Sequence, residues 1–183
     1  GFPAGCHVKT GTCLIDIAAT AVDVTGVKHD EISRELPGLS LRGIANNEDD
    51  PNRTIFSEYH DGGSTTGTFM VRWGHWKFTY YVDHAPQLFD LKADPNELIN
   101  LAANKKNDPI IQASLKEGEK RLREICDPEK INSKCFEDQK CRIEELGGRK
   151  ACINSYVFNH TPTPAEQKKL KASLEAVDKL NNI

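Results

Sequence analysis

Apolar side chains recur at helical spacing near the start of the chain, at Leu14, Ile15, Ala18, Ala21 and Val22. Thr12 is a candidate N-cap, Asp16 would place a negative charge in the first turn, and Gly26 is a natural helix end. The small side chains of this segment indicate close packing, and its polar face is thin. We therefore expect a helix over residues 13–25 that is buried in part by residues outside the chain.

The pattern then changes to short runs of aromatic and β-branched side chains, which predict strands over 53–60, 67–73, 76–82 and 87–91. Turn signals separate these runs, among them Asp61-Gly62-Gly63 and Gly74-His75. The connections are too short for parallel crossovers, so we expect a four-stranded antiparallel sheet. One face of such a sheet must be covered. The amphipathic pattern over residues 109–125 predicts the helix that covers it.

The remaining segments divide into loops and shorter helices. Residues 27–52, with Pro37-Gly38 and a polar run before the first strand, are expected to form a loop. Further helices are predicted over 96–102, 135–146 and 165–181. Gly147-Gly148 should end the second of these, and a short apolar segment over 153–158 follows it.

Composition and charge exclude several classes of partner. The formal net charge is −3 and the sequence pI is about 6.1, so no basic excess is available for nucleic acid or an anionic membrane. No apolar run approaches the ~20 residues of a membrane span. The first residues lack the basic and apolar regions of a signal peptide, and the chain opens without methionine. We expect a fragment of a longer protein, with no nucleic-acid and no membrane partner.

The cysteines leave two interpretations open. They are Cys6, Cys13, Cys126, Cys135, Cys141 and Cys152. The last four follow the spacing C-x8-C-x5-C-x10-C rather than the paired C-x2-C of a zinc ribbon, so we expect no structural metal. Either one or two disulfides form in an oxidising compartment, or buried thiols act as small hydrophobic groups.

Three stretches together carry a resemblance. The first is Leu-Ile-Asp-Ile-Ala-Ala-Thr-Ala-Val-Asp-Val-Thr-Gly-Val at 14–27, followed by Gly-Leu-Ser-Leu at 38–41. The second is Phe-Ser-Glu-Tyr-His at 56–60 with Met-Val-Arg-Trp-Gly-His-Trp-Lys-Phe at 70–78. The third, at 87–102, is Gln-Leu-Phe-Asp-Leu-Lys-Ala-Asp-Pro-Asn-Glu-Leu-Ile-Asn-Leu-Ala. In this order and spacing they resemble the C-terminal portion of the type I sulfatases, in the alkaline-phosphatase superfamily. Glu58-Tyr59-His60 is faintly similar to the choline-sulfatase branch.

The resemblance implies an α+β fold with three parts. Residues 1–45 would end the α/β catalytic domain, 46–125 would form the antiparallel C-terminal subdomain, and 126–183 a cysteine-containing helical extension. The full-length protein would hydrolyse a sulfate ester of a small molecule or sugar, with a formylglycine made from Cys or Ser and a calcium ion. Both groups would belong to the N-terminal catalytic portion, which would be the partner of this chain. The chain itself would supply a wall of the substrate cleft.

The residues of this chain supply neither group. No cysteine is followed by x-Pro-x-Arg, and Cys126, the nearest, precedes Asp-Pro-Glu-Lys. Asp49-Asp50 lies in a polar loop rather than beside an apolar strand. The motifs of other hydrolases and of phosphate-binding loops are absent from the sequence. We therefore predict no catalytic residue, no metal ligand and no bound cofactor in this chain, and no activity for the chain alone.

His60 is the candidate substrate-binding residue. It ends a predicted strand beside a glycine-rich turn, and an imidazole can donate to a substrate oxygen. A packing or surface role for His60 is the alternative. Arg72 is a weaker candidate, for which an ion pair or a place on the sheet surface is expected. Trp73, Trp76 and Phe78 are expected to pack on the sheet.

Two further functions and the compartment stay open. A phosphatase or phosphodiesterase of the same superfamily would carry two transition-metal sites upstream. A non-catalytic binding or structural module would melt cooperatively as a monomer. The cysteines and the glycosylation sequons at Asn52 and Asn159 slightly favour secretion or the periplasm, whereas the choline-sulfatase likeness points to the cytoplasm. The sequence names no substrate.

Overall fold

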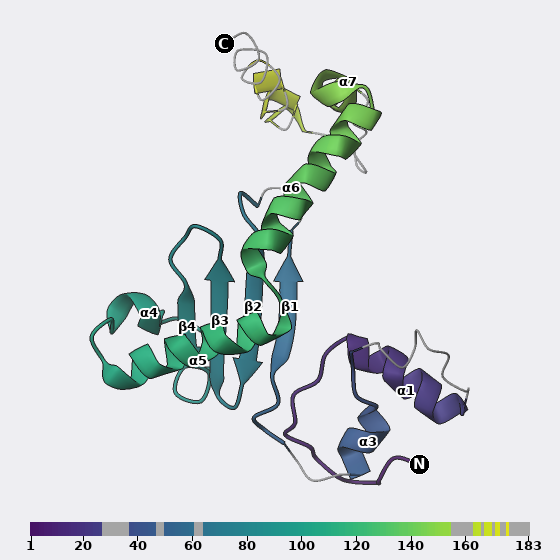
Figure 1. Ribbon diagram of the computed structural model, residues 1–183, viewed down its shortest axis with the longest axis vertical. Coiled ribbons are helices and arrows are strands. Elements are labelled where there is room, and N and C mark those ends of the chain that lie inside the picture. The colour runs from purple at the N-terminus through teal and green to yellow at the C-terminus, as the bar shows by residue number, and fades with distance from the viewer. Residues whose placement is uncertain are drawn as a thin grey trace. The chain divides into compact units, whose positions relative to one another are not determined.

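The computed structural model (Figure 1) describes residues 1–26, 37–46, 50–60 and 64–154, and positions 163–165, 167–169, 171–172 and 175. These residues group into two compact units, Gly1–Asn132 and Ser133–Ile183, and each is considered by itself. Within the described stretches, no helix combines the length and the apolar character that a membrane crossing requires.

The first unit contains the predicted four-stranded sheet. Its strands are β1 (Ile55–Tyr59), β2 (Thr68–Trp73), β3 (Trp76–Tyr81) and β4 (Gln87–Asp90). They pair antiparallel in chain order, β1-β2-β3-β4. Each strand lies within its predicted range and is slightly shorter. The predicted antiparallel α+β arrangement is therefore confirmed.

Alternation along β2 decides which face of the sheet forms the core. Phe69, Val71 and Trp73 are buried, while Arg72 between them is exposed on the other face. Phe78 of β3 lies opposite Val71 in the register and joins the same face. The buried cluster consists of Phe69, Val71, Trp73, Phe78, Val82, Leu88, Ile111 and Leu122.

Helix α5 (Pro109–Ile125) crosses this face of the sheet (Figure 1), as the amphipathic pattern predicted. Asp108 is its N-cap, and Oδ1 accepts from the amides of Ile110 and Ile111 at 2.9 and 3.4 Å. A β-carbon added to Gly118 would lie 2.6 Å from Phe78 Cγ. This glycine therefore permits the close approach of the helix to the sheet.

Helix α1 (Ile15–Thr25) begins later than predicted, and Thr12 is not its cap. The preceding residue, Leu14, makes no side-chain cap bond. Instead, the Asp16 carboxylate in the first turn accepts from the Cys13 amide at 2.8 Å. The side chain of the first turn therefore reaches back to an amide just before the helix, as the acidic residue of a capping box does.

The segment predicted as a loop over 27–52 contains a helix, α3 (Leu41–Asn46). The prediction was wrong here because six residues are too few to show a clear helical period. Residues 27–36 and 47–49 of the same segment lie outside the described residues.

Helix α4 (Leu101–Asn104) corrects the helix predicted over 96–102. Glu97 has a left-handed backbone, with φ of 55°, so a helix cannot run through it. Asn100 is the cap, because its Oδ1 accepts from the Ala102 amide at 3.1 Å. The same oxygen accepts from the Leu88 amide of β4 at 3.1 Å, which ties α4 to the sheet.

Helix α6 (Pro128–Glu145) begins well before residue 135, where the pattern placed its start. Asp127 and Pro128 provide the start signal, with Asp127 Oδ1 accepting from the Lys130 amide at 3.0 Å. Gly148, the second of the two glycines that were expected to end a helix, also begins the next one, α7 (Gly148–Asn154).

Two predictions in the second unit fall mainly on undescribed residues. Residues 155–158 of the predicted apolar segment lie outside the described residues. Of the tail helix predicted over 165–181, the positions described between 165 and 175 are helical.

Candidate functional site

Asp16 is a fully buried carboxylate that joins three separate segments of the first unit. It accepts from the Cys13 amide and from the Leu39 amide, both at 2.8 Å. The Arg53 guanidinium, just before β1, donates two further bonds at 2.8 and 2.9 Å. Arg53 lowers the pKa of Asp16 to about 2, against the opposing effect of burial. Helix α1, residues 37–40 and the entry to β1 are thereby held together.

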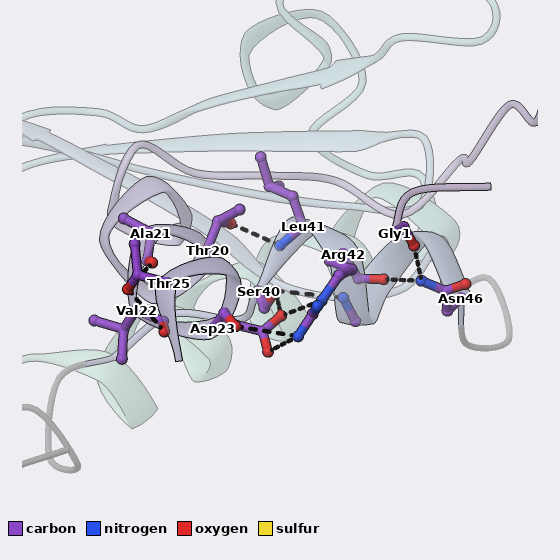
Figure 2. Close-up of polar contacts among 11 residues, drawn as sticks. Gly1, Thr20, Ala21, Val22, Asp23, Thr25, Ser40, Leu41, Arg42 and Asn46 are labelled. Atoms are coloured by element: carbon purple, nitrogen blue, oxygen red, sulfur yellow. Dashed lines mark hydrogen bonds and ion pairs between the residues drawn. The ribbon is translucent and has the colours of Figure 1, made fainter. Parts of the chain in front are cut away.

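A second set of polar contacts joins α1 to α3 (Figure 2). Asp23 of α1 accepts from Arg42 Nε at 2.8 Å and from the Ser40 hydroxyl. Arg42 also donates through a terminal nitrogen to Asp23, which makes the ion pair bidentate. One turn earlier, the Thr20 hydroxyl accepts from the Leu41 amide at 2.8 Å. These contacts therefore hold α1 and α3 together.

Helix α1 and the residues just before α1 and α3 expose large apolar side chains to solvent. They are Leu14, Ile15, Ile17, Val24 and Leu39, and they are between 48% and 85% exposed. Burying one side chain of this size contributes roughly 1.5–3 kcal/mol. A set of exposed apolar side chains of this size is typical of a surface that contacts another protein segment. Helix α1 is thus only partly buried within this chain, and its burial by residues outside the chain stays a prediction.

His60 directly follows β1 and packs against the core. Its ring meets Phe69 edge-on, with centroids 5.1 Å apart and planes at 74°. Its Nε2 lies 3.4 Å from Glu58 Oε2, and 19% of the side chain is exposed. His60 is therefore packed against the core, as the alternative to a substrate-binding role expected, and a small part of its side chain is exposed to solvent. The turn that follows, residues 61–63, lies outside the described residues.

The structure does not bring Arg72 to His60. Arg72 is exposed on β2, three residues beyond Phe69, which is about 10 Å along the strand. It lies on the face of the sheet opposite to Phe69. Trp73 and Phe78 belong to the buried cluster and Trp76 packs against it, so their predicted packing role is confirmed.

The cysteines are thiols in the structure. No disulfide joins the six, all of which lie in described stretches. Burial, followed by the nearby Glu58 carboxylate, raises the pKa of Cys126, which makes this thiol a poor nucleophile. Across the described residues, no group of three or more His, Cys, Asp or Glu side chains could hold a metal ion.

Sequence reasoning missed two residues that position others, Arg53 and Asn132. Arg53 contacts Asp16 across 37 positions of the chain. Asn132, in α6, accepts from the Gly67 amide at 2.7 Å across 65 positions. Neither residue belongs to a local pattern, so no signal in the sequence marked them.

Comparison with known proteins gives a family. Residues 3–125 match the family model described as N-sulphoglucosamine sulphohydrolase, C-terminal. Arylsulfatase K of Mus musculus is 32% identical over 151 residues, 76% of this chain and 26% of its own length. The choline-sulfatase of Rhizobium meliloti (strain 1021) is 35% identical over 115 residues, 63% of this chain and 22% of its own length.

A solved structure of a 2-O GAG sulfatase is 27% identical in sequence, with a TM-score of 0.43. The match covers 78% of this chain and 28% of that chain. The chain thus spans about a quarter of the length of the curated relatives described above. All three stretches that carry the resemblance lie within the residues that the family model matches. The chain belongs to the sulfatase family, of which it forms a C-terminal part.

Proposed function

We propose that this chain is the C-terminal subdomain of a sulfuric ester hydrolase and closes one wall of its substrate cleft. The family match over residues 3–125 carries the proposal. Arylsulfatase K and choline-sulfatase, as relatives, favour a sulfate ester over a phosphate ester. The substrate would be a sulfated small molecule or sugar.

The partner in this proposal is the N-terminal catalytic portion of the same protein. Residues 1–45 would complete its α/β domain, 46–125 would form the subdomain, and 126–183 the extension. The exposed apolar side chains of α1 support this arrangement, because contact with the catalytic portion would bury them. The Asp16–Arg53 pair would then fix this piece of the catalytic domain to the sheet.

Calcium and formylglycine belong to the catalytic portion in this proposal. In the described residues no ligand cluster is present, and no cysteine has the Pro and Arg that the formylglycine motif requires. When bound, the cation would stabilise negative charge on the sulfate oxygens. The residues of this chain would shape the cleft and exclude water from it.

His60 is the side chain through which this chain would contact the substrate. Phe69 and Glu58 orient its ring, and 19% of the side chain is exposed to solvent, although the Nε2 atom itself is buried. An imidazole offers one N–H donor when neutral and two when protonated. Such donors suit the oxygens of a sulfate ester.

Two proteins test the proposal: the 183-residue chain and the same chain extended through the catalytic portion. The chain alone should release no sulfate from an aryl sulfate, and the extended protein should release it in a calcium-dependent reaction. In the extended protein, His60→Ala should lower kcat/KM by about ten-fold or more. His84→Ala, at an exposed histidine in the turn after β3, is the matched control.

Release of phosphate but not sulfate by the extended protein would contradict the proposed hydrolase. Sulfate release by the chain alone would contradict its inactivity. Unchanged kinetics in His60→Ala would remove His60 from the cleft, while the subdomain assignment would stand on the other two measurements.

A further inference from the structure

The ring of His60, at the end of β1, lies in a slot formed by Gly67 and Phe69 at the start of β2. Phe69, near the start of β2, meets the ring from one side. A β-carbon added to Gly67 would lie 2.9 Å from His60 Cε1 and 3.0 Å from Nδ1. Gly67 is not among the residues with a positive φ, so space and not backbone conformation requires a glycine here. Gly67 is therefore a wall of the slot.

The returning half of this connection is fixed to the rest of the first unit at two points. The Thr66 hydroxyl donates to the Val82 carbonyl, just after β3, at 3.0 Å. The Gly67 amide donates to Asn132 Oδ1 at 2.7 Å. Thr66 attaches the connection to the sheet, whereas Asn132 attaches Gly67 itself to a helix.

The beginning of α6 is itself held on the sheet. Glu129 accepts from the Tyr80 hydroxyl of β3 at 2.6 Å. Its carboxylate also accepts two bonds from the Arg123 guanidinium of α5, both at 2.9 Å. Asn132 follows less than one turn later, so its side chain is presented to Gly67 from a fixed start of the helix.

We propose that Asn132 is a positioning residue for His60. By holding Gly67, it fixes the wall against which the imidazole lies, and so the direction in which the ring can meet a ligand. This inference rests on the proposed contact of His60 with substrate. Asn132 lies beyond residues 3–125, so the extension would contribute to a site that the matched family segment does not complete. A displacement of about 1 Å at a reacting or binding group can cost on the order of 100-fold in rate.

The position of His60 is measured first by NMR in the 183-residue chain. Asn132→Leu removes the acceptor at similar volume, Asn132→Asp keeps an acceptor, and Gly67→Ala places a β-carbon in the slot. We expect an upfield shift of the Gly67 amide proton in Asn132→Leu, and a shifted His60 Hε1 resonance in both Asn132→Leu and Gly67→Ala. Asn132→Asp should restore the Gly67 amide shift.

Gly118→Ala is the control for general destabilisation, because its β-carbon would meet Phe78 in the core and not His60. It should leave the His60 resonance in place. A His60 resonance that also stays in place in Asn132→Leu and Gly67→Ala overturns the positioning role. If Asn132→Leu does not fold, Asn132→Ala, which also removes the acceptor of the Gly67 amide, carries the same comparison.

Kinetics of the extended protein separate this inference from the proposed function. Asn132→Leu should lower kcat/KM on its own but cost little more in a His60→Ala background, because both changes act through one ring. Equal losses in both backgrounds overturn the positioning role. No loss in His60→Ala alone overturns the proposed role of His60 in the cleft, while the NMR comparison still decides whether Asn132 positions the ring.

Discussion

Among single residues, the Asp16–Arg53 pair shows how burial changes the role of a charge. As a sequence feature, Asp16 is one acidic residue in a first helical turn. In the structure its side chain is fully buried, that of Arg53 is 14% exposed, and the two are 2.8 Å apart. The remaining carboxylate lone pairs accept backbone amides, which offsets the cost of removing both charges from water.

Asp16→Asn should therefore destabilise the chain strongly. The substitution leaves the Arg53 guanidinium buried without its counter-charge, and we expect a loss of about 3–5 kcal/mol in the free energy of unfolding. Denaturation in urea measures it. Asp138→Asn, which removes an exposed ion pair with Lys134, should change stability little. Equal losses in the two variants would show that the buried pair has no special role.

At the scale of elements, the approach of α5 to the sheet depends on one small residue. Gly118 is buried in the middle of the helix, where glycine is normally unfavourable. Its lack of a side chain leaves room for Phe78 of β3. Packing thus overrides the intrinsic preference of the helix at this position.

Gly118→Ala tests this balance. The gain in helix propensity is about 1 kcal/mol, whereas forcing a β-carbon to 2.6 Å from Phe78 Cγ requires the core to shift at a cost of about 1–3 kcal/mol. We expect a net loss of stability in thermal or urea unfolding. Lys116→Ala, at an exposed position of the same helix, should be neutral or slightly stabilising. A stabilised Gly118→Ala variant would mean that the helix can move away without loss.

For the whole molecule, the free energy of unfolding should depend on pH through carboxyl groups whose pKa values are lowered in the folded state. The folded pKa of Asp16 is about 2, against an ordinary value of 3.8. Because the unfolded state binds the proton more readily, this stabilisation is present above about pH 4 and disappears as the pH falls toward 2. Asp16 should contribute roughly 2 kcal/mol at neutral pH.

Glu129, whose pKa is also lowered to about 2, first by Arg123 and then by Tyr80, acts in the same direction. Its side chain is 44% exposed, so solvent weakens its contribution. Urea unfolding at a series of pH values should show constant stability from pH 7 to about 5 and a decline below. The decline should be shallower in Asp16→Asn, and an identical slope in that variant would contradict the assignment to Asp16.

The exposed apolar side chains of α1 predict self-association of the isolated chain. The double substitution Ile17→Gln and Val24→Gln should shift sedimentation toward the monomer, because these side chains are 58% and 56% exposed. Unfolding should change little. Ile110→Gln, at a side chain of α5 that is 68% exposed, is the control and should leave association unchanged. A wild-type chain that sediments as a monomer at all concentrations would argue against a contact surface on α1.

The sequence by itself determined the elements whose patterns are local and repeated. Runs of aromatic and β-branched side chains between turn signals predicted β2, β3 and β4 closely, because such side chains suit the pleated surface of a sheet. An amphipathic period predicted α5, because it records which side chains face a core. Three ordered motifs also indicated the family that the match over residues 3–125 shows. The starts of α4 and α6 were less predictable, since they depend on caps at Asn100 and Asp127 rather than on periodicity.

Only the tertiary structure decided which distant residues meet. Asp16 with Arg53 and Gly67 with Asn132 are pairs separated by 37 and 65 positions, and they form because folding brings otherwise unrelated segments into contact. His60 illustrates the division. Its place at the end of a strand could be inferred from the sequence. Its packing on Phe69 and its distance to Glu58 follow from the antiparallel pairing of β1 with β2, which sets Glu58 opposite Phe69.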